Sequence, residues 1–215
     1  METKEKLQEA YIQYVLTHGE QPKSVYIFVK DNDLAEEEFY NHFGSFESIE
    51  EIIWAGLMIS TITEVRAQEV WNQYSSREKA LSLFYSFIEL LKSKRSFASF
   101  SLKHSEKIIG TRKILVGLKA EFEAFAIQII QEGIESGELI DRPFFANKYK
   151  DALWVQFVFV LNFWLKDSSA GFEKTDEAIE KGLNVTYNLF QRSPIDELFE
   201  YGKFLAKNAG IKMPF

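Results

Sequence analysis

Apolar residues recur every three or four positions along most of this chain, which is the spacing of one face of an α-helix. After residue 45, for example, Ile49, Ile52, Ile53, Leu57 and Ile62 follow this pattern. Glycine and proline, the residues that most often interrupt helices, number only 11 and 4 in 215 residues. The sequence therefore predicts an all-α protein.

Capping and turn residues divide this pattern into separate helices. Gly19 can end a first helix that contains Leu7 and His18, and Ser24 can cap the second. The predicted helices after the first are residues 25–31, 35–41, a long one capped by Ser45 or Ser48, 76–93 (opened by Ser76 with Lys79 three residues later), a short or broken one within 92–105, 111–136, 144–166, 175–191 and 193–208.

The helices before Gly44 are short and those after it are long. Three short helices of this size, with Gly44-Ser45 as a break, are typical of a helix-turn-helix module. We therefore predict a helix-turn-helix module of residues 1–45 and a larger helical domain of residues 46–215.

The composition argues against catalysis and metal binding. The chain has no cysteine, and its histidines at positions 18, 42 and 104 are far apart in the sequence. Glycine-rich phosphate loops, G-x-S-x-G and H-E-x-x-H are all absent from the sequence. We expect no enzymatic activity, no metal site and no cofactor.

The sequence favours a cytoplasmic protein. Residues 1–10 are charged and amphipathic, unlike a secretory signal. The most apolar stretch, residues 153–165, contains Gln156 and Asn162 and is shorter than the roughly 20 residues that cross a bilayer.

Negative charge is concentrated at the start of the chain. Residues 1–50 carry eleven Asp and Glu but only four Lys, while the whole chain has a net charge of −7. Because DNA affinity depends on cations placed against phosphates, an acidic surface weakens binding to DNA.

Residues 34–45, LAEEEFYNHFGS, resemble the recognition helix and its exit in the tetracycline-repressor (TetR) family, chiefly through Tyr40, His42, Phe43 and Ser45. Gly19 and Val25 also fall where that family ends its first helix and begins its second. Residues 132–139, EGIESGEL, are similar to the end of a long helix in the regulatory domain of such proteins, and Trp164 lies in the helix that follows.

This resemblance implies that the N-terminal module binds operator DNA. The implied DNA-binding residues are Ser24, Glu36, Glu37, Glu38, Tyr40, Asn41 and His42. Burial tendencies favour another role for Tyr40 and Phe43, as core residues that hold the third helix against the first and fourth. His42 is open between a phosphate contact and a surface or capping role.

Several residues depart from the family pattern. Glu36, Glu37 and Glu38 replace the small, polar or basic groups of a recognition helix, and Phe46 replaces a frequent Lys at the start of the fourth helix. Three carboxylates beside a polyanion cost affinity, although acidic residues in a first turn also favour the helix dipole.

Two further positions in the turn depart from the pattern. Ala35 replaces the usual hydroxyl cap of the third helix, and Asp33 replaces the usual turn glycine. Asp tolerates the left-handed conformation better than most residues, so we expect the turn to survive.

The same resemblance implies a pocket for a small apolar ligand within the larger domain. Aromatic residues at helical spacing, which recur along the larger domain, are also typical of an ordinary core. The candidate pocket residues are Trp54, Met58, Phe84, Phe87, Phe122, Phe125, Trp154 and Phe157. Helices 144–166 and 175–191 would then form the four-helix interface of a homodimer.

The leading hypothesis is a TetR-like transcriptional regulator that binds DNA as a dimer under the control of a small apolar ligand. The alternative is a protein of the same fold without DNA binding, which holds a lipid or isoprenoid or uses its acidic module to bind a protein partner. The acidic module adds weight to the alternative.

Overall fold

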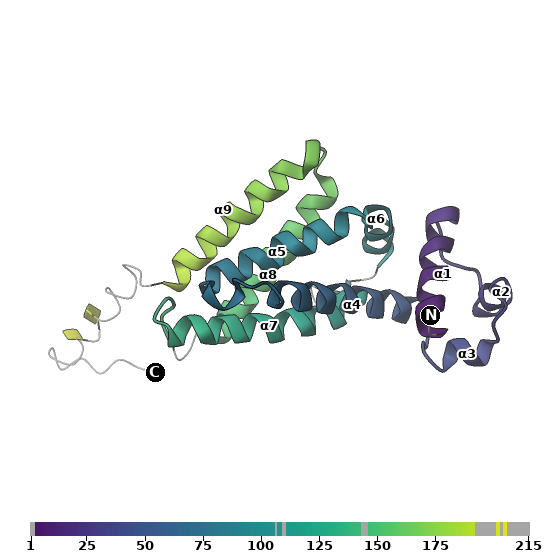
Figure 1. Ribbon diagram of the computed structural model, residues 1–215, viewed down its shortest axis with the longest axis horizontal. Helices are drawn as coiled ribbons and strands as arrows, with labels where there is room; N and C mark the ends of the chain where they lie inside the picture. Colours follow the sequence, from purple (N-terminus) through teal and green to yellow (C-terminus); the bar gives the residue numbers. More distant parts are fainter. Residues whose placement is uncertain are drawn as a thin grey trace.

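The computed structural model describes residues 3–105, 107–108, 111–142, 146–191, 201–202 and 204–205. The first three helices form a head at one end of an elongated molecule, and the later helices form a body (Figure 1). A single long helix, α4 (Phe46–Arg66), runs from the head into the body. The predicted all-α fold is confirmed.

The head consists of α1 (Thr3–His18), α2 (Val25–Lys30) and α3 (Glu36–Tyr40). Leu7, Tyr11 and Val15 lie four residues apart and form the buried face of α1. Gly19 ends α1 with a positive φ of 72°, as the sequence predicts.

Serine side chains open α2 and α4 as predicted. The hydroxyl of Ser24 accepts a hydrogen bond from the Ile27 amide at 3.2 Å. The hydroxyls of Ser45 and Ser48 each accept from the other residue's amide, at 3.2 and 3.0 Å, which satisfies donors at the start of α4. The fourth helix therefore begins directly after the head.

The body packs long helices against one another, and α4 contacts two of them, α5 (Ser76–Lys92) and α7 (Val116–Glu135). Their buried faces carry aliphatic and aromatic side chains at helical spacing, such as Leu83, Phe84 and Phe87 on one helix and Leu118, Phe122 and Phe125 on another. Its helices are α5, α6 (Arg95–His104), α7, α8 (Ala146–Lys166) and α9 (Glu173–Phe190), with 3-10 turns η1 (Trp71–Gln73), η2 (Lys113–Leu115) and η3 (Ala170–Phe172).

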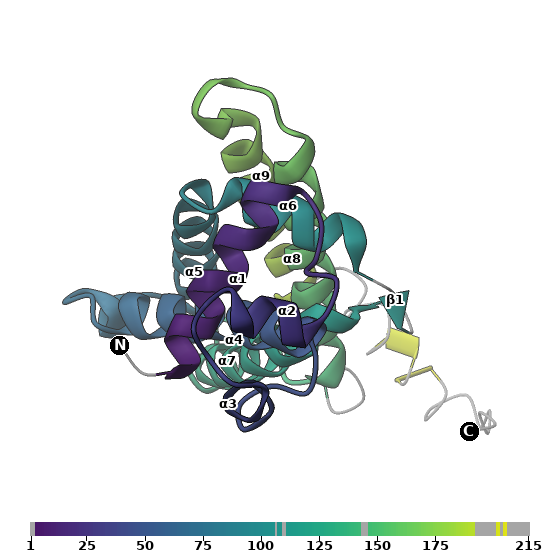
Figure 2. The same cartoon turned by 90° about the vertical axis from the view of Figure 1, so that its right-hand side faces the viewer.

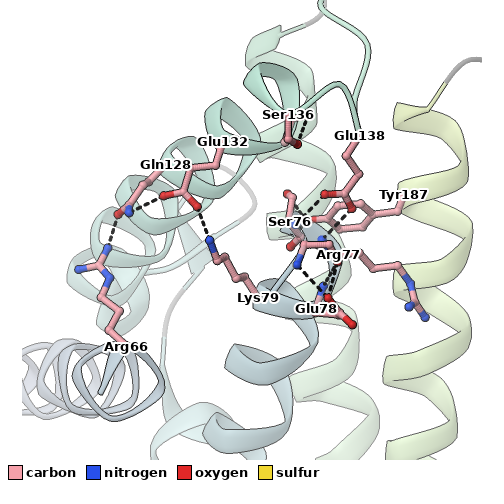
Figure 3. A network of polar contacts seen from close by, with 12 residues as sticks. Arg66, Ser76, Arg77, Glu78, Lys79, Gln128, Glu132, Ser136, Glu138 and Tyr187 are labelled. Carbon is pink, nitrogen blue, oxygen red and sulfur yellow. Dashed lines mark hydrogen bonds and ion pairs between the residues drawn. The ribbon is translucent and has the colours of Figure 1, made fainter. Parts of the chain in front are cut away.

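The start of α5 at Ser76 agrees with the prediction. Ser75, not Ser76, is the capping residue, and its hydroxyl and amide bond to the carboxylate of Glu78 at 2.8 Å. The carboxylate of Glu138 accepts from the amides of Ser76 and Arg77 at 2.7 and 3.1 Å, so a second anion caps the same helix end (Figure 3). Lys79, three residues after Ser76, forms an ion pair with Glu132 on α7 at 2.6 Å.

The helix predicted for residues 111–136 begins later than expected. Two-residue strands β1 (Lys107–Ile108) and β2 (Thr111–Arg112) pair antiparallel, η2 follows, and α7 starts at Val116. The guanidinium of Arg112 donates to the carbonyl oxygens of Leu102 and Ser105, the latter at 3.5 Å, and so holds the segment against the end of α6. This contact is between residues ten apart, and helical periodicity does not report it.

The helix predicted for residues 193–208 lies mostly outside the described residues, although 201–202 and 204–205 are helical. Among the described residues, no helix has the length and apolar character needed to cross a bilayer.

Candidate functional site

Aromatic rings form the core of the head. Phe28 and Phe39, from α2 and α3, are fully buried and contact edge to face at 6.3 Å between ring centroids. Phe46, at the start of α4, meets both rings at 5.4 and 5.6 Å and stacks on Tyr11 of α1 at 5.5 Å. Phe46, where the family often has a Lys, therefore joins α4 to the head core.

The turn between α2 and α3 keeps its geometry without glycine. Asp33 adopts a positive φ of 55°, and the Leu34 amide donates to the Val29 carbonyl at 2.9 Å. The Asn32 side chain donates to the Phe28 carbonyl at 2.7 Å. The expectation that Asp33 preserves the turn is confirmed.

Glu38 supplies the carboxylate half of a capping box at the start of α3. Its carboxylate reaches back to the amide of Ala35 at 2.8 Å, while Ala35 itself has no side chain that could cap. Of the three consecutive glutamates, Glu36 and Glu37 are exposed and Glu38 is half-buried. One of the three carboxylates therefore stabilises the helix, and two face solvent.

The end of α3 is an exposed polar surface. Tyr40 is 56% exposed, whereas Phe43 is 2% exposed. The core role is thus confirmed for Phe43 and wrong for Tyr40, whose ring rests edge-on against Phe39 at 5.3 Å. Asn41 and His42 are also exposed.

Not every residue implied for DNA binding has a free side chain. The hydroxyl of Ser24 is engaged in capping α2, and the carboxylate of Glu38 in capping α3. The side chains that α3 and its exit present together to solvent are Glu36, Glu37, Tyr40, Asn41 and His42.

The candidate pocket residues of the body pack against one another. Phe157 of α8 lies 4.8 Å from Phe122, 5.2 Å from Phe87 and 5.5 Å from Phe84, measured between ring centroids. Trp154 contacts Phe122 at 5.5 Å. All eight candidates are at most 7% exposed: Trp54, Met58, Phe84, Phe87, Phe122, Phe125, Trp154 and Phe157. The structure brings them together in one hydrophobic core, and we call its rings the aromatic core.

The outer surface of α8 and α9 carries exposed apolar side chains. Val155 and Phe159 on α8 are 67% and 53% exposed, and Val185 and Leu189 on α9 are 62% and 61% exposed. Each pair is four residues apart, so each forms a stripe on one side of its helix. We call these four residues the apolar face.

Sequence reasoning missed one buried carboxylate between head and body. Glu50 of α4 is 2% exposed. It accepts hydrogen bonds from the phenol of Tyr11 at 2.5 Å, from Gln21 at 3.2 Å and from the hydroxyl of Ser101 on α6. The available signal was its position between Phe46 and Ile53, at helical spacing on the buried face of α4.

Burial and the carboxylate of Glu50 both raise the pKa of the Tyr11 phenol. Loss of solvation raises the pKa of Tyr11 well above its usual range, and the adjacent carboxylate of Glu50 raises this pKa further. Tyr11 therefore stays protonated and acts as a hydrogen-bond donor to Glu50.

A cavity of about 270 Å³ lies beside this carboxylate. Its wall includes an ion pair between Lys113 and Glu47 at 3.2 Å. The lining residues come from the head, α4, α6 and η2, and are Glu20, Gln21, Glu47, Glu50, Phe100, His104, Ser105, Lys113 and Ile114.

Solved structures share the fold of the whole chain. A TetR-family transcription regulator from Shewanella sp. PV-4, itself described as putative, matches with a TM-score of 0.60 at 14% identity, over 90% of this chain and 100% of that one. The TetR regulator from Nitrosomonas europaea matches with a TM-score of 0.62 at 11% identity, over 86% and 98%. FadR from Bacillus subtilis, solved with stearoyl-CoA, matches with a TM-score of 0.59 at 17% identity, over 83% and 97%.

At these identities the likeness establishes the fold. No curated protein sequence matches the chain. Residues 79–205, more than half of the chain, match the sequence family described as tetracyclin repressor-like, C-terminal domain. The chain therefore belongs to the tetracycline-repressor-like family of transcriptional regulators.

Proposed function

We propose that the protein is a dimeric transcriptional regulator of the cytoplasm, in which residues 1–45 bind operator DNA and residues 46–215 hold a small apolar ligand and the partner subunit. Family membership supports regulation rather than catalysis. The observation that carries the proposal is the retained helix-turn-helix, in which Tyr40, Asn41 and His42 are exposed together at the end of α3.

The aromatic core supports an apolar ligand. Its rings offer a surface that suits an aliphatic or isoprenoid chain, and the FadR protein of similar fold was solved with stearoyl-CoA. A ligand would enter by displacing rings such as Phe87 and Phe157, which now contact each other. Native mass spectrometry of the purified protein tests this, since a bound apolar molecule adds a defined mass and repeated absence would contradict the ligand.

The exposed carboxylates favour a second candidate function. Glu36 and Glu37 lie beside the exposed ring of Tyr40, and an acidic surface with an aromatic side chain suits a basic protein partner better than DNA. In this alternative the protein keeps the same fold and binds an apolar ligand or a protein partner, but it binds no operator DNA.

Selection from genomic DNA fragments across a salt series separates the two functions. An operator-binding dimer enriches fragments with two half-sites about one helical turn apart, and its affinity falls steeply as salt rises. Absence of any enrichment at low salt would contradict the regulator and leave the second candidate.

Charge removal on α3 tests whether this surface approaches DNA. Because Glu38 caps α3, the suitable variant is Glu36→Gln with Glu37→Gln, which leaves the cap intact. We expect it to raise non-specific DNA affinity by removing repulsion from phosphates. The matched control is Glu64→Gln with Glu69→Gln, an equal charge change at exposed positions of the body. Equal affinities of the two variants would show that α3 does not face DNA.

A further inference from the structure

One carboxylate is shared by the head and two helices of the body. Glu50 belongs to α4, Tyr11 to α1 in the head, and Ser101 to α6 in the body. Helices α1 and α6 are in contact, and α1 crosses in front of α6 when the molecule is viewed from the head (Figure 2). Any movement of α6 relative to α1 must therefore change at least one bond to Glu50.

Ser101 extends this contact into the aromatic core. Its hydroxyl donates to Glu50 and accepts from the indole N–H of Trp54 at 3.0 Å. Trp54 is fully buried, and its ring lies 6.5 Å from that of Phe87. A continuous series of contacts thus runs from the core through Ser101 and Glu50 to Tyr11, whose ring stacks on Phe46 in the head core.

Glu50 depends on these neutral donors. It forms no ion pair with any residue in the part of the chain that the structure describes. A carboxylate taken out of water without a counter-charge is costly unless hydrogen bonds replace its solvation, so losing one donor weakens the whole arrangement. This makes the positions of Tyr11 and Ser101 energetically interdependent.

The junction around Glu50 also has room to change. The cavity beside it separates Gln21 on the head side from Phe100 and His104 on α6. Packing at this cavity is less dense than in a filled core, which leaves space there for a shift of α6 relative to Gln21. The hydrogen bonds of Glu50 then determine how closely the two parts move together.

We propose that Glu50 is the positioning residue that couples the aromatic core to the head. A change in the core that displaces Trp54 or α6 alters the bond from Ser101 to Glu50, and with it the hold of Glu50 on Tyr11. This inference rests on the proposed function, in which occupancy of the core controls the head, and it assigns that control to three named side chains.

The test measures amide hydrogen exchange in the full chain, without DNA or ligand, so its outcome is independent of operator binding. Phe87→Leu perturbs the core next to Trp54 and serves in place of a ligand. In the otherwise unchanged protein we expect Phe87→Leu to speed exchange in α1 as well as in α5. Ser101→Ala alone should speed exchange in α1 roughly tenfold, the effect of one hydrogen bond to a charged group.

The decisive result is the combination of the two substitutions. If Glu50 couples the core to the head through Ser101, adding Phe87→Leu to Ser101→Ala does not speed exchange in α1 any further. Exchange in α5 still becomes faster. A purely structural role of Ser101 would give additive effects in α1, and additivity overturns the proposal. The proposal is also overturned if Phe87→Leu, as the only substitution, leaves the exchange rate of α1 unchanged.

Two further variants keep the test independent of folding failures. Trp54→Phe removes the indole donor to Ser101 together with part of the buried ring, and should weaken the same coupling. Ser93→Ala removes a hydroxyl that bonds locally to the Leu90 carbonyl at 3.0 Å, outside this series of contacts. It should leave the response of α1 to Phe87→Leu unchanged, and loss of the response in this control would overturn the assignment to Ser101.

Discussion

The phenol of Tyr187 donates to the backbone carbonyl of Ser76 at 2.9 Å, and its oxygen lies 3.0 Å from the Ser76 hydroxyl, across 111 residues of sequence (Figure 3). This contact ties α9 to the first turn of α5, where Glu138 caps the same residues. Burial raises the pKa of Tyr187 above its usual range, so the phenol remains a donor at neutral pH.

Removing this phenol should destabilise the body. Tyr187→Phe keeps the ring but removes the hydrogen bond to the Ser76 carbonyl and leaves the buried Ser76 hydroxyl without this partner, at an expected cost of about 1–3 kcal/mol in the free energy of unfolding. Denaturant titration measures the change. Tyr85→Phe is the control, because the phenol of Tyr85 makes a longer bond of 3.3 Å to Asp176 at a site that is 36% exposed. A larger cost for Tyr85→Phe would contradict this account.

The carboxylate of Asp167 should make stability depend on acidic pH. It accepts from the hydroxyl and amide of Ser169 at 2.7 and 2.8 Å, and from the hydroxyl and amide of Thr175 at 2.7 and 3.0 Å. These hydrogen bonds, led by that of the Ser169 hydroxyl, hold the pKa of Asp167 well below its usual range.

The sign of the pH effect follows from this lowered pKa. The contribution of Asp167 is present above about pH 4, the pKa of an unfolded Asp, and is lost as the pH falls further. Asp167→Asn should lower the urea midpoint at pH 7 and reduce its dependence on pH below 4. Asp31→Asn, an equal charge change at an exposed site, should do neither. If Asp167→Asn leaves the dependence of the urea midpoint on pH below 4 unaltered, Asp167 does not make this contribution to stability.

Gly133 should resist substitution although it lies inside a helix. A Cβ there would lie 2.8 Å from the Leu139 side chain and 2.9 Å from the Cβ of Ser76. We expect Gly133→Ala to destabilise the protein by about 1–3 kcal/mol through overpacking. Gly56→Ala, with open space around its Cβ, should instead stabilise by up to about 1 kcal/mol through helix propensity. Thermal unfolding of both variants checks the opposite signs.

The apolar face of α8 and α9 should mediate dimer formation. Phe159→Glu places a charge on this face, where a partner subunit would bury it, and should shift the protein to monomers in sedimentation equilibrium. Ile127→Glu on α7 is the matched control, since Ile127 is equally exposed at 53%. An unchanged dimer in Phe159→Glu, or a monomer in both variants, would reject this interface.

Local pattern alone determined the helices and most of their ends. Apolar spacing in α1, α4 and α5 reports which face is buried, because that spacing follows from the geometry of a helix. Caps such as Ser24 and Ser45, and the left-handed Asp33, act within three or four residues of themselves, so the sequence reveals them. The family resemblance was also readable from such short segments.

Tertiary contacts decided the features that matter most for function. Tyr40 is exposed and Phe43 is buried because Phe39 packs against Phe28 and Phe46, which fixes the rotation of α3 about its axis. No local pattern encodes that rotation. The late start of α7 depends on Arg112 reaching the end of α6. Glu50 acquires its role only when α1 and α6, which are distant in sequence, bring Tyr11 and Ser101 to one carboxylate. The sequence by itself determined a helical TetR-like chain with an acidic head, and only the packing of its helices decided which carboxylates face solvent and which one joins the head to the body.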